Sequence, residues 1–488
     1  SLGNEEKICL TTEDFQVKGI SCNSKEVREG FVFIAIRGTK ADGSEFIEEA
    51  IKRGAEAIVL QSAGHGAIGI GQRLPASTKI PIIQVKDARR ALAKLAQKFY
   101  GNPSSKIKVV GITGTNGKTT ISYLIEAIIK EAGYAPSVIG TINYRFKDKI
   151  IPSKNTTPAP IELQSLLAQM LKTGIDYSII EVSSHALHQD RTEGMNFHSA
   201  IFTNLTQDHL DYHKTIDNYY KSKEKLFRNL KKNSFAVINN DDKYGLKLKS
   251  RTKAEVVTYG IVRSSSVMAK DLRFGCRSTS FKLLTPKGKI EILCPLIGLH
   301  NVYNVLASCA WAQREDIRFE AIKSAIEKFA PVPGRLERID FDGKFKVFVD
   351  YAHTEDALKN IIASLRRLCR NRLIVVFGCG GDRDKTKRPK MGRVVSELAD
   401  YAIVTSDNPR SEEPWQIINE IRKGIRKDNY CLIPQRFEAI KRALSIAREG
   451  DIVLVAGKGH EDYQVLRDRI IHFDDRQVIR ECLNSLNY

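Results

Sequence analysis

The stretch GITGTNGKTT, Gly111–Thr120, lies between an apolar run and a helical pattern. The strand signal KVVGI leads into a glycine-rich turn, and Lys118 and Thr119 open the predicted helix. Backbone N–H groups of such a turn and of a helix N-terminus favour an anion. Lys118 would add positive charge at the β- and γ-phosphates of a nucleotide, and Thr119 would offer a hydroxyl to Mg²⁺. The stretch therefore predicts a nucleotide site built on a strand, a loop and a helix.

The loop departs from the usual P-loop spacing. The glycine expected five residues before Gly117 is Ile112, and Gly111 lies six residues before it. The strand, the turn and the helix still follow one another in the order that a phosphate-binding loop needs. We therefore interpret the stretch as a variant P-loop rather than as a turn that only resembles one.

Working outward from the loop, length and strand rhythm predict three blocks. A chain of 488 residues is too long for one ordinary core. Strand and helix signals alternate in residues 1–105, and residues 106–333 hold the loop and several buried strand runs. In residues 334–488 the runs KVFVDYAH, RLIVVFG, YAIVTSD and DIVLVAG alternate with helical patterns. That rhythm is typical of a parallel sheet, so we expect an α/β fold.

Composition and charge exclude several classes of protein. The 77 Lys and Arg residues outnumber the 57 Asp and Glu residues, for a net charge of +20. The basic residues are dispersed among acids, which favours small polyanionic substrates over nucleic acid as partners. The longest apolar runs have strand length, so no membrane insertion is expected. The start SLGNEEKICL has no apolar core of signal-peptide length, and the nine cysteines form no CxxC pair, which together indicate a reducing cytoplasm.

Polar clusters follow the carboxyl ends of all four strand runs in residues 334–488. In an open parallel sheet, that edge is where ligands bind. Four such clusters in one block define a site rather than chance turns. They are Asp350 with His353, Asp382 with Arg383, Asp407–Arg410, and Lys458–Glu461.

Two segments of residues 106–333 carry further candidate ligands. Glu181 ends a strand run where a second carboxylate for Mg²⁺ would lie, whereas Ser183 could equally cap the next helix. Zinc is conceivable at His209 with His213, but cysteine partners and the HExxH pattern are missing. Lys223 lies in an amphipathic helical pattern, where taken alone it reads as an ordinary surface lysine.

The motifs taken together resemble the Mur ligases of bacterial cell-wall synthesis. They are GTNGKTT, NTTP, EVSSHAL, TNLTQDHLDYH, SKEKLF, GLHNVYNVLAS, PGRLE, DYAHTEDAL and AGKGHED. Their order and spacing cover nearly the whole chain, and the pattern is most similar to the members that add the third amino acid. The resemblance implies a uridine-binding α/β domain at 1–105, a central P-loop ATPase domain at 106–333 and a Rossmann-like amino-acid-binding domain at 334–488. It also implies a monomer.

The resemblance assigns ligands residue by residue. The residues implied for ATP are Gly114, Thr115, Asn116, Gly117, Lys118, Thr119, Thr120, Asn301, Asn304, Arg335 and Asp350. Those implied for UDP-N-acetylmuramoyl-L-alanyl-D-glutamate, the UDP-muramoyl dipeptide, are Ser24, Asn155, Thr156, Thr157, Ser183, Gln189 and Arg191. Around Ser24 the chain reads Asn-Ser-Lys, where the family usually shows Asp-Ser-Arg.

The resemblance also implies two Mg²⁺ ions and a modified lysine. Lys223 would be carbamylated by CO₂, which turns a cation into a carboxylate-like ligand beside His209. Thr119 and Glu181 would complete the metal ligands. The catalytic set would then be Lys118, Glu181, His209 and Lys223.

The segment SDNPRSEEP indicates the incoming amino acid. Pro409 fixes the turn that aims Arg410, and the planar guanidinium of arginine suits a carboxylate. meso-Diaminopimelate has a distal carboxylate for such a clamp, and lysine does not. The resemblance agrees, because the DNPR form accompanies diaminopimelate enzymes. The residues expected to bind it are Arg383, Asp407, Asn408, Pro409, Arg410, Gly457 and Glu461.

The expected reaction is ATP-driven amide formation through an acyl phosphate. Rival hypotheses are a lysine-adding homologue, which would leave Arg410 unpaired, and a folylpolyglutamate synthetase, against which the N-terminal block and NTTP argue. A nucleic-acid-dependent P-loop motor would suit the net charge of +20 but lacks an arginine-rich tract or aromatic signature. A non-catalytic nucleotide-binding scaffold would need the loop without the magnesium and Lys223 groups.

Overall fold

The computed structural model describes residues 16–38, 41–62 and 80–486. The opening segment SLGNEEKICL lies outside the described residues. Contacts within the chain define two compact units. Unit 1 contains the described residues up to Gly111 together with Ala135–Ser199, and unit 2 contains Ile112–Tyr134 and the chain from Ala200 onward.

The first part of unit 1 is a small parallel sheet with helices. Its strands follow the order β1-β2-β3-β4, and all neighbours are parallel. Apolar side chains on both faces of the sheet form two separate clusters, one of which packs on α2. The elements are β1 (Gly19–Ser21), β2 (Phe31–Ala35), α1 (Ile47–Lys52), β3 (Ala55–Gln61), β4 (Ile82–Val85) and α2 (Ala88–Phe99).

The second part of unit 1 places polar residues after β9. Here β6 pairs in parallel with β9 and antiparallel with β7. β7 in turn pairs antiparallel with β8. The side chains of β9 are all buried, up to Glu181 at its carboxyl end. The elements are β6 (Pro136–Ile139), β7 (Asn143–Phe146), β8 (Lys149–Pro152), α4 (Pro160–Lys172), β9 (Tyr177–Glu181) and α5 (Ser184–His188).

Unit 2 begins at Ile112, just before the phosphate loop. β5 (Lys108–Thr113) leads into the loop, and α3 (Lys118–Glu131) follows it. The strands of this part run in the order β15-β14-β13-β12-β11-β10. β13, β14 and β15 are antiparallel neighbours. The elements are β10 (Ser199–Phe202), α6 (Leu210–His213), α7 (Ile216–Arg228), β11 (Phe235–Asn239), α8 (Lys243–Leu248), β12 (Glu255–Gly260), β13 (Val267–Phe274), β14 (Thr279–Thr285), β15 (Gly288–Cys294), α9 (Leu299–Arg314) and α10 (Phe319–Glu327).

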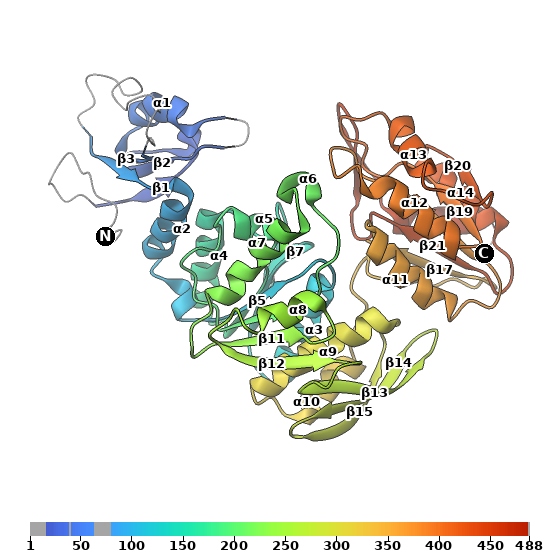
Figure 1. The fold of residues 1–488 in the computed structure, drawn as a ribbon. Helices are drawn as coiled ribbons and strands as arrows, with labels where there is room; N and C mark the ends of the chain where they lie inside the picture. The colour runs from blue at the N-terminus through green and yellow to red at the C-terminus, as the bar shows by residue number, and fades with distance from the viewer. Residues whose placement is uncertain (1–15, 39–40, 63–79, 487–488) are drawn as a thin grey trace. The chain divides into compact units, whose positions relative to one another are not determined.

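The rest of unit 2 is a doubly wound sheet. Its strand order is β16-β17-β21-β18-β19-β20, parallel throughout except for β16. Helices α11, α12 and α13 cover one face of this sheet, and α14 and α15 cover the other (Figure 1). The elements are β16 (Glu337–Ile339), β17 (Lys346–Asp350), α11 (Glu355–Arg366), β18 (Leu373–Phe377), α12 (Lys387–Leu398), β19 (Tyr401–Val404), α13 (Pro414–Arg422), β20 (Tyr430–Leu432), α14 (Arg436–Ile446), β21 (Ile452–Ala456), β22 (Tyr463–Val465), β23 (Ile470–His472) and α15 (Asp475–Ser485).

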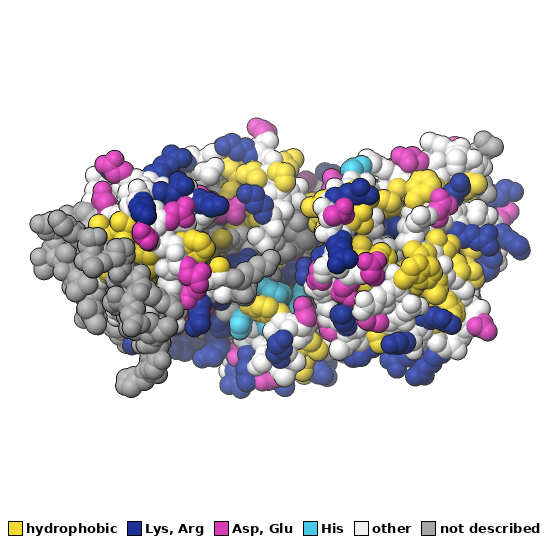
Figure 2. All heavy atoms as spheres, turned by 90° about the horizontal axis from the view of Figure 1, so that it is seen from above, with side chains coloured by type: hydrophobic (Ala, Val, Ile, Leu, Met, Phe, Trp, Pro, Cys, Tyr) yellow, Lys and Arg dark blue, Asp and Glu magenta, His cyan; other side chains and the backbone are white. Residues whose placement is uncertain are grey.

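The α/β fold class predicted from the strand rhythm is confirmed. The four predicted runs of residues 334–488 are β17, β18, β19 and β21, and β18 and β21 are buried along their whole length. Strands covered on both faces need apolar side chains at every position, which explains the uninterrupted runs. None of the described helices has the length and apolarity to cross a bilayer. On the face that Figure 2 shows, Lys and Arg side chains are interspersed with Asp and Glu.

Candidate active site

The phosphate loop has a backbone that residues other than glycine would strain. Gly114 has φ +152° and Gly117 has φ +91°. A Cβ added at Gly117 would also collide with Oδ1 of Asn304. α3 begins at Lys118 without a side-chain cap, because its N-cap residue is Gly117. The first N–H groups of α3 can therefore bind an anion.

Neighbouring groups hold the loop in this conformation. The N–H of Asn116 donates to Oδ1 of Asn204 at 3.0 Å, and the N–H of Thr115 donates to the Asn204 carbonyl at 2.8 Å. The Lys118 ammonium donates to the carbonyls of Gly114 and Thr115 at 3.0 and 2.9 Å. The positive charge of Lys118 therefore lies directly against the loop.

Lys223 is buried against the same loop. It is 2% exposed, and its Nζ donates to the Gly114 carbonyl at 2.8 Å and lies 4.6 Å from the centroid of the Tyr219 ring. The interpretation of Lys223 as a surface lysine is therefore wrong. Burial, with help from the charge of Lys118, lowers the pKa of Lys223 well below its usual value. A lowered pKa leaves more of the amine neutral near pH 7, and only a neutral amine can add to CO₂.

Asp208, a buried carboxylate whose charge acts on Lys223, has two histidines beside it. Nε2 of His209 is 3.3 Å and Nε2 of His353 4.0 Å from Oδ2 of Asp208. Burial would raise the pKa of Asp208, but His209, His353 and Lys387 lower it overall, so the carboxylate stays ionised. Nδ1 of His353 lies 2.8 Å from the Tyr351 carbonyl. Our sequence-based assignment of ligands omitted Asp208, and it placed His353 in the polar cluster with Asp350 without giving it a ligand.

Of the four residues implied for the nucleotide outside the loop, Asn304 and Arg335 lie beside the start of α3. Nη2 of Arg335 donates to Oγ1 of Thr119 at 3.2 Å, and its guanidinium lies 4.4 Å from the centroid of the Tyr351 ring. Nδ2 of Asn304 donates to Oδ1 of Asn301 at 3.0 Å. Asp350 accepts the N–H groups of Leu336 and Ala352, each at 2.6 Å.

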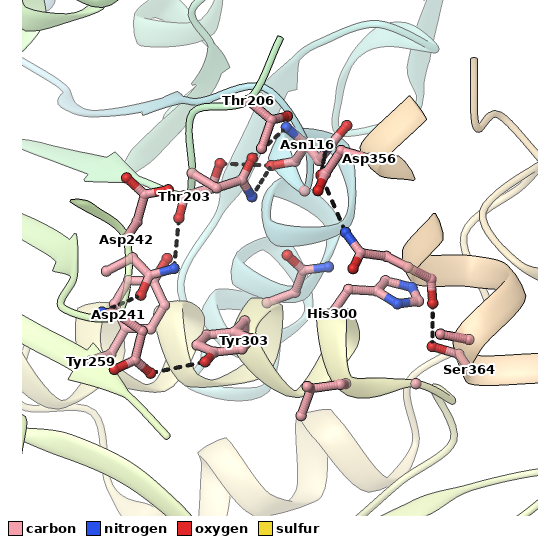
Figure 3. A pocket seen from close by; sticks show the side chains of 18 of the residues that line it. Asn116, Thr203, Thr206, Asp241, Asp242, Tyr259, His300, Tyr303, Asp356 and Ser364 are labelled. Atoms are coloured by element: carbon pink, nitrogen blue, oxygen red, sulfur yellow. Dashed lines mark hydrogen bonds between the residues drawn. The ribbon is translucent and has the colours of Figure 1, made fainter. Parts of the chain in front are cut away.

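Three of these four residues line one or the other of two cavities. A cavity of about 320 Å³ is lined by Asn116, Gly117 and Asn304, with residues of α11 and the chain after β11 (Figure 3). Figure 3 shows Asn116 beside Asp356, to which its Nδ2 donates at 3.1 Å, with Asp241 and Tyr303 at the opposite side. A second cavity of about 280 Å³ is lined by residues that include Asn301 and Arg335.

Asp350 has a raised pKa, which would make nucleotide binding sensitive to pH if its carboxylate contacts the nucleotide. Burial raises the pKa of this carboxyl to about 6, although Arg335 opposes the shift. If Asp350 accepts hydrogen bonds from a ribose, only its ionised form can accept them at both oxygens. We expect ADP binding to tighten as pH rises through about 6, by up to about tenfold per unit below that value. Calorimetry with the wild type and Asp350→Asn measures the effect.

The same shift fixes the sign of a stability effect. Because the folded pKa of Asp350 lies above the unfolded value of about 4, the native state binds more protons between the two values. The contribution of Asp350 to the free energy of unfolding therefore falls as pH rises from about 4 to 6. Asp350→Asn should remove this slope. It should also reduce the pH dependence of ADP affinity to the part that the titration of ADP itself causes. An unchanged pH profile in the variant would contradict this role.

In unit 1, most of the residues implied for the UDP-muramoyl dipeptide form one hydrogen-bonded cluster. Oγ1 of Thr157 donates to the Glu181 carbonyl at 2.7 Å and accepts the N–H of Ser183 at 3.0 Å. Nη1 of Arg191 donates to the Thr157 carbonyl at 2.8 Å, and its Nη2 donates to Oε1 of Gln189 at 2.8 Å. The cluster fixes the direction of these side chains after β9.

Thr141 joins this cluster and was not anticipated. Its Oγ1 donates to Oε2 of Glu181 at 2.9 Å and lies 3.1 Å from Oγ1 of Thr156. The Asn155 carbonyl accepts the Tyr144 hydroxyl at 2.6 Å. Ser24, in contrast, is bonded within the four-stranded sheet part, where its Oγ donates to Oε2 of Glu49 at 2.6 Å.

Ser183 is the N-cap of α5, so a cap and a substrate role must be separated by experiment. Its Oγ accepts the N–H of Ala186 at 3.1 Å. Ser183→Ala should lower the free energy of unfolding by about 1 kcal/mol, whereas Ser183→Asp keeps a capping oxygen. If Ser183 also binds the anionic dipeptide, Asp should raise its KM far more than Ala does. Equal KM values in all three proteins would contradict a substrate role.

The residues implied for diaminopimelate meet at the carboxyl edge of the second sheet of unit 2. Nη1 of Arg410 donates to the Gly381 carbonyl at 2.8 Å, and Arg410 has φ +53°. Nδ2 of Asn408 donates to Oε2 of Glu461 at 2.8 Å. A Cβ at Gly380 would lie 2.8 Å from Nη1 of Arg410 and 3.9 Å from Cγ of Arg383, so both arginines flank this glycine.

Electrostatics at this edge are set by buried carboxylates. Burial, reinforced by Asp407, raises the pKa of Glu461. Asp407 is buried and accepts the N–H of Asn408 at 2.6 Å. A Cβ at Gly457, which has φ +120°, would approach Oδ2 of Asp407 to 2.5 Å. The edge thus combines two arginines with two carboxylates, a set that suits a zwitterion.

Comparison with known proteins agrees with this arrangement. Residues 112–312 match the Mur ligase middle domain, residues 334–459 match the glutamate ligase domain of Mur ligases, and residues 16–100 match the Mur ligase family catalytic domain. A protein of Clostridium tetani is 43% identical over 475 residues, which cover 97% of this chain and 96% of that protein. A protein of Geobacillus kaustophilus is 43% identical over 477 residues, 96% and 95% of the two chains. Both are named UDP-N-acetylmuramoyl-L-alanyl-D-glutamate–2,6-diaminopimelate ligase.

Solved structures give the same result. A structure with that same name superposes with a TM-score of 0.67 at 31% identity, covering 96% of this chain and 95% of the other. The MurF ligase of Thermotoga maritima in complex with ADP superposes with a TM-score of 0.65 at 19% identity, covering 97% and 99%, and so shares the fold. The chain belongs to the Mur ligase family.

Proposed function

We propose that this chain is the ATP-dependent ligase that adds meso-diaminopimelate to UDP-N-acetylmuramoyl-L-alanyl-D-glutamate during peptidoglycan precursor synthesis. Near-full-length relatives named for this reaction support the proposal. The observation that carries the choice of amino acid is Arg410, which is anchored to Gly381 beside Asn408 and Glu461. A guanidinium held in this way matches a distal carboxylate, which lysine lacks.

The reaction couples phosphoryl transfer to amide formation. The γ-carboxylate of the D-glutamate attacks the γ-phosphorus of ATP in line, ADP leaves, and an acyl phosphate forms. The diaminopimelate amine then attacks the acyl carbon, loses a proton, and phosphate leaves from the tetrahedral intermediate. The protein contributes mainly by positioning the reactants and by offsetting charge. Lys118, Arg335 and the N-terminus of α3 supply that positive potential.

The residues present suit Mg²⁺, provided that Lys223 is modified. Among the described residues, no three His, Cys, Asp or Glu side chains gather into a ready-made metal site. The proposed ligands therefore include the Thr119 hydroxyl and a carbamate on Lys223, with His209 and Glu181. The buried amine of Lys223, with its lowered pKa, fits such a carbamate. When bound, two Mg²⁺ ions would neutralise charge on the phosphates.

We assign the remaining roles from the family resemblance. Residues 1–105 would hold the uridine end, with a contact from Ser24. Residues 106–333 would bind ATP and the dipeptide, and residues 334–488 would bind the amino acid. We also propose a monomer from the resemblance. The interspersed charges on the face in Figure 2 support the absence of a nucleic-acid partner, and the eight cysteines that are free among the described residues support a reducing cytoplasm.

Product stoichiometry tests the proposed function. The protein is incubated with ATP, Mg²⁺, the UDP-muramoyl dipeptide and diaminopimelate, and phosphate and the UDP-muramoyl tripeptide are both measured. We expect one phosphate for each tripeptide, and little product when L-lysine replaces diaminopimelate. ATP cleavage without tripeptide, or tripeptide without cleavage, would contradict the proposal.

A further inference from the structure

A buried ion-pair cluster underlies the loops that carry Arg383 and Arg410. Arg388, at the start of α12, has a side chain that is 0% exposed. Its Nη1 and Nη2 donate to the two carboxylate oxygens of Glu412, each at 2.9 Å, and Nη1 also donates to Oε2 of Glu420 at 2.8 Å. Two parallel bonds to one carboxylate fix the orientation of both groups.

Glu412 extends this cluster to the preceding loop. Its Oε1 accepts the N–H of Asp382 at 2.6 Å, and Nη2 of Arg388 donates to the Gly380 carbonyl at 3.3 Å. The Ser411 hydroxyl donates to Oδ1 of Asp382 at 2.6 Å. The hydrogen bond from Arg388 is the leading cause that lowers the pKa of Glu412 to about 2, so this carboxylate stays ionised. The cluster therefore ties loop Gly380–Arg383 to loop Asn408–Glu412.

Direct backbone packing adds to this connection. A Cβ at Gly381 would collide with the Pro409 carbonyl, so the two loops touch without intervening side chains. The Arg410 guanidinium is itself anchored on the Gly381 carbonyl at 2.8 Å. A shift of one loop must therefore move the other, and with it the separation of Arg383 and Arg410.

We propose that Arg388 is a positioning residue that fixes the separation of Arg383 and Arg410 and thereby sets the affinity for the incoming amino acid. This inference rests on the proposed function. Binding of a substrate with two carboxylates, one at each arginine, depends on the distance between the loops. Binding of ATP and of the UDP-muramoyl dipeptide does not. The cluster thus acts on diaminopimelate binding rather than on phosphoryl transfer.

The test separates amino-acid binding from activation of the carboxylate. In Arg388→Lys, one ammonium replaces the bidentate guanidinium, and in Glu420→Gln the outer partner loses its charge. We expect Arg388→Lys to raise the KM for diaminopimelate on the order of 10- to 100-fold, and Glu420→Gln to raise it severalfold. The KM values for ATP and for the UDP-muramoyl dipeptide should not change. Hydroxylamine captures acyl phosphates as hydroxamates. When diaminopimelate is absent, both variants should form the hydroxamate from the UDP-muramoyl dipeptide and ATP at the wild-type rate.

A matched control lies at the opposite edge of the same sheet. Arg372 precedes β18, and its Nε and Nη2 donate to Oδ2 of Asp451 at 3.2 and 2.6 Å. Arg372→Lys should leave the KM for diaminopimelate unchanged. The inference would be overturned if folded Arg388→Lys had the wild-type KM for diaminopimelate. It would also be overturned if the KM values for all three substrates rose equally and hydroxamate formation slowed by the same factor. If Arg388→Lys does not fold, Glu420→Gln decides in the same way.

Failure of the proposed function would look different. In that case the wild-type protein itself would form neither the tripeptide nor a hydroxamate from the UDP-muramoyl dipeptide. Failure of the inference alone leaves the wild-type reaction intact and removes only the selective effect of the Arg388 and Glu420 substitutions.

Discussion

Lys223→Ala should lower kcat on the order of 10³-fold while the protein remains folded. Lys223 is buried beside the Gly114 carbonyl, where a carbamate would supply an anionic oxygen pair for the proposed Mg²⁺. Because its pKa is lowered, the amine is more often neutral near pH 7 and can add CO₂. Steady-state kinetics with circular dichroism as a folding check measures the loss.

Two further measurements separate a carbamate from a simple ammonium. A short carboxylic acid such as acetate should restore part of the activity of Lys223→Ala, because it can replace the missing carboxylate-like group. Removal of CO₂ and bicarbonate should lower wild-type activity reversibly. The control is Lys221→Ala, since Lys221 is exposed and paired with Asp217 at 2.7 Å, which raises its pKa. Full activity of Lys223→Ala would contradict the carbamate. So would wild-type activity that stays the same when CO₂ and bicarbonate are removed.

Arg410→Lys should lower kcat/KM for diaminopimelate on the order of 100-fold. The substitution keeps the charge but removes the planar pair of donors that a carboxylate accepts. The variant should use L-lysine, which lacks the distal carboxylate, as poorly as the wild type does. The preference for diaminopimelate over lysine should therefore shrink by a similar factor. Competition between the two amino acids in one reaction measures the preference directly.

The control for Arg410 is an arginine nearby that points elsewhere. Arg467 is 75% exposed in its side chain and lies 3.5 Å from Glu413. Arg467→Lys should leave both amino acids unaffected. Diaminopimelate turnover that is untouched in Arg410→Lys would show that the clamp assignment is wrong.

Much of the fold could be predicted from local sequence. The run LIVVF of β18 is apolar at every position because helices cover both faces of its sheet, and this pattern is visible without a structure. Parallel strands have their carboxyl ends on one side of the sheet. This rule predicts that four polar residues meet at one edge: Asp350, Arg383, Asp407 and Glu461. In contrast, β13, β14 and β15 alternate weakly and are partly exposed, so their antiparallel pairing was not anticipated.

The parts of the site that residue spacing alone did not predict depend on tertiary packing. Lys223 looks like a surface residue in its helix, and only the family resemblance assigned it to the site; in the structure it is buried, with its Nζ on the Gly114 carbonyl of the phosphate loop. Thr141 follows a short strand and carries no motif, yet it is bonded to Glu181. Arg388 and Glu412 are 24 residues apart, and nothing local indicates that they pair. Such contacts are set by how elements pack, which residue spacing does not record.

Oxygen-isotope transfer tests the acyl phosphate most directly. The UDP-muramoyl dipeptide is prepared with ¹⁸O in both oxygens of the D-glutamate γ-carboxylate and converted with ATP and diaminopimelate. If the carboxylate captures the terminal phosphoryl group, each phosphate released must carry one ¹⁸O atom, and the new amide must retain the other. Phosphate free of label, or label found in AMP, would contradict the mechanism.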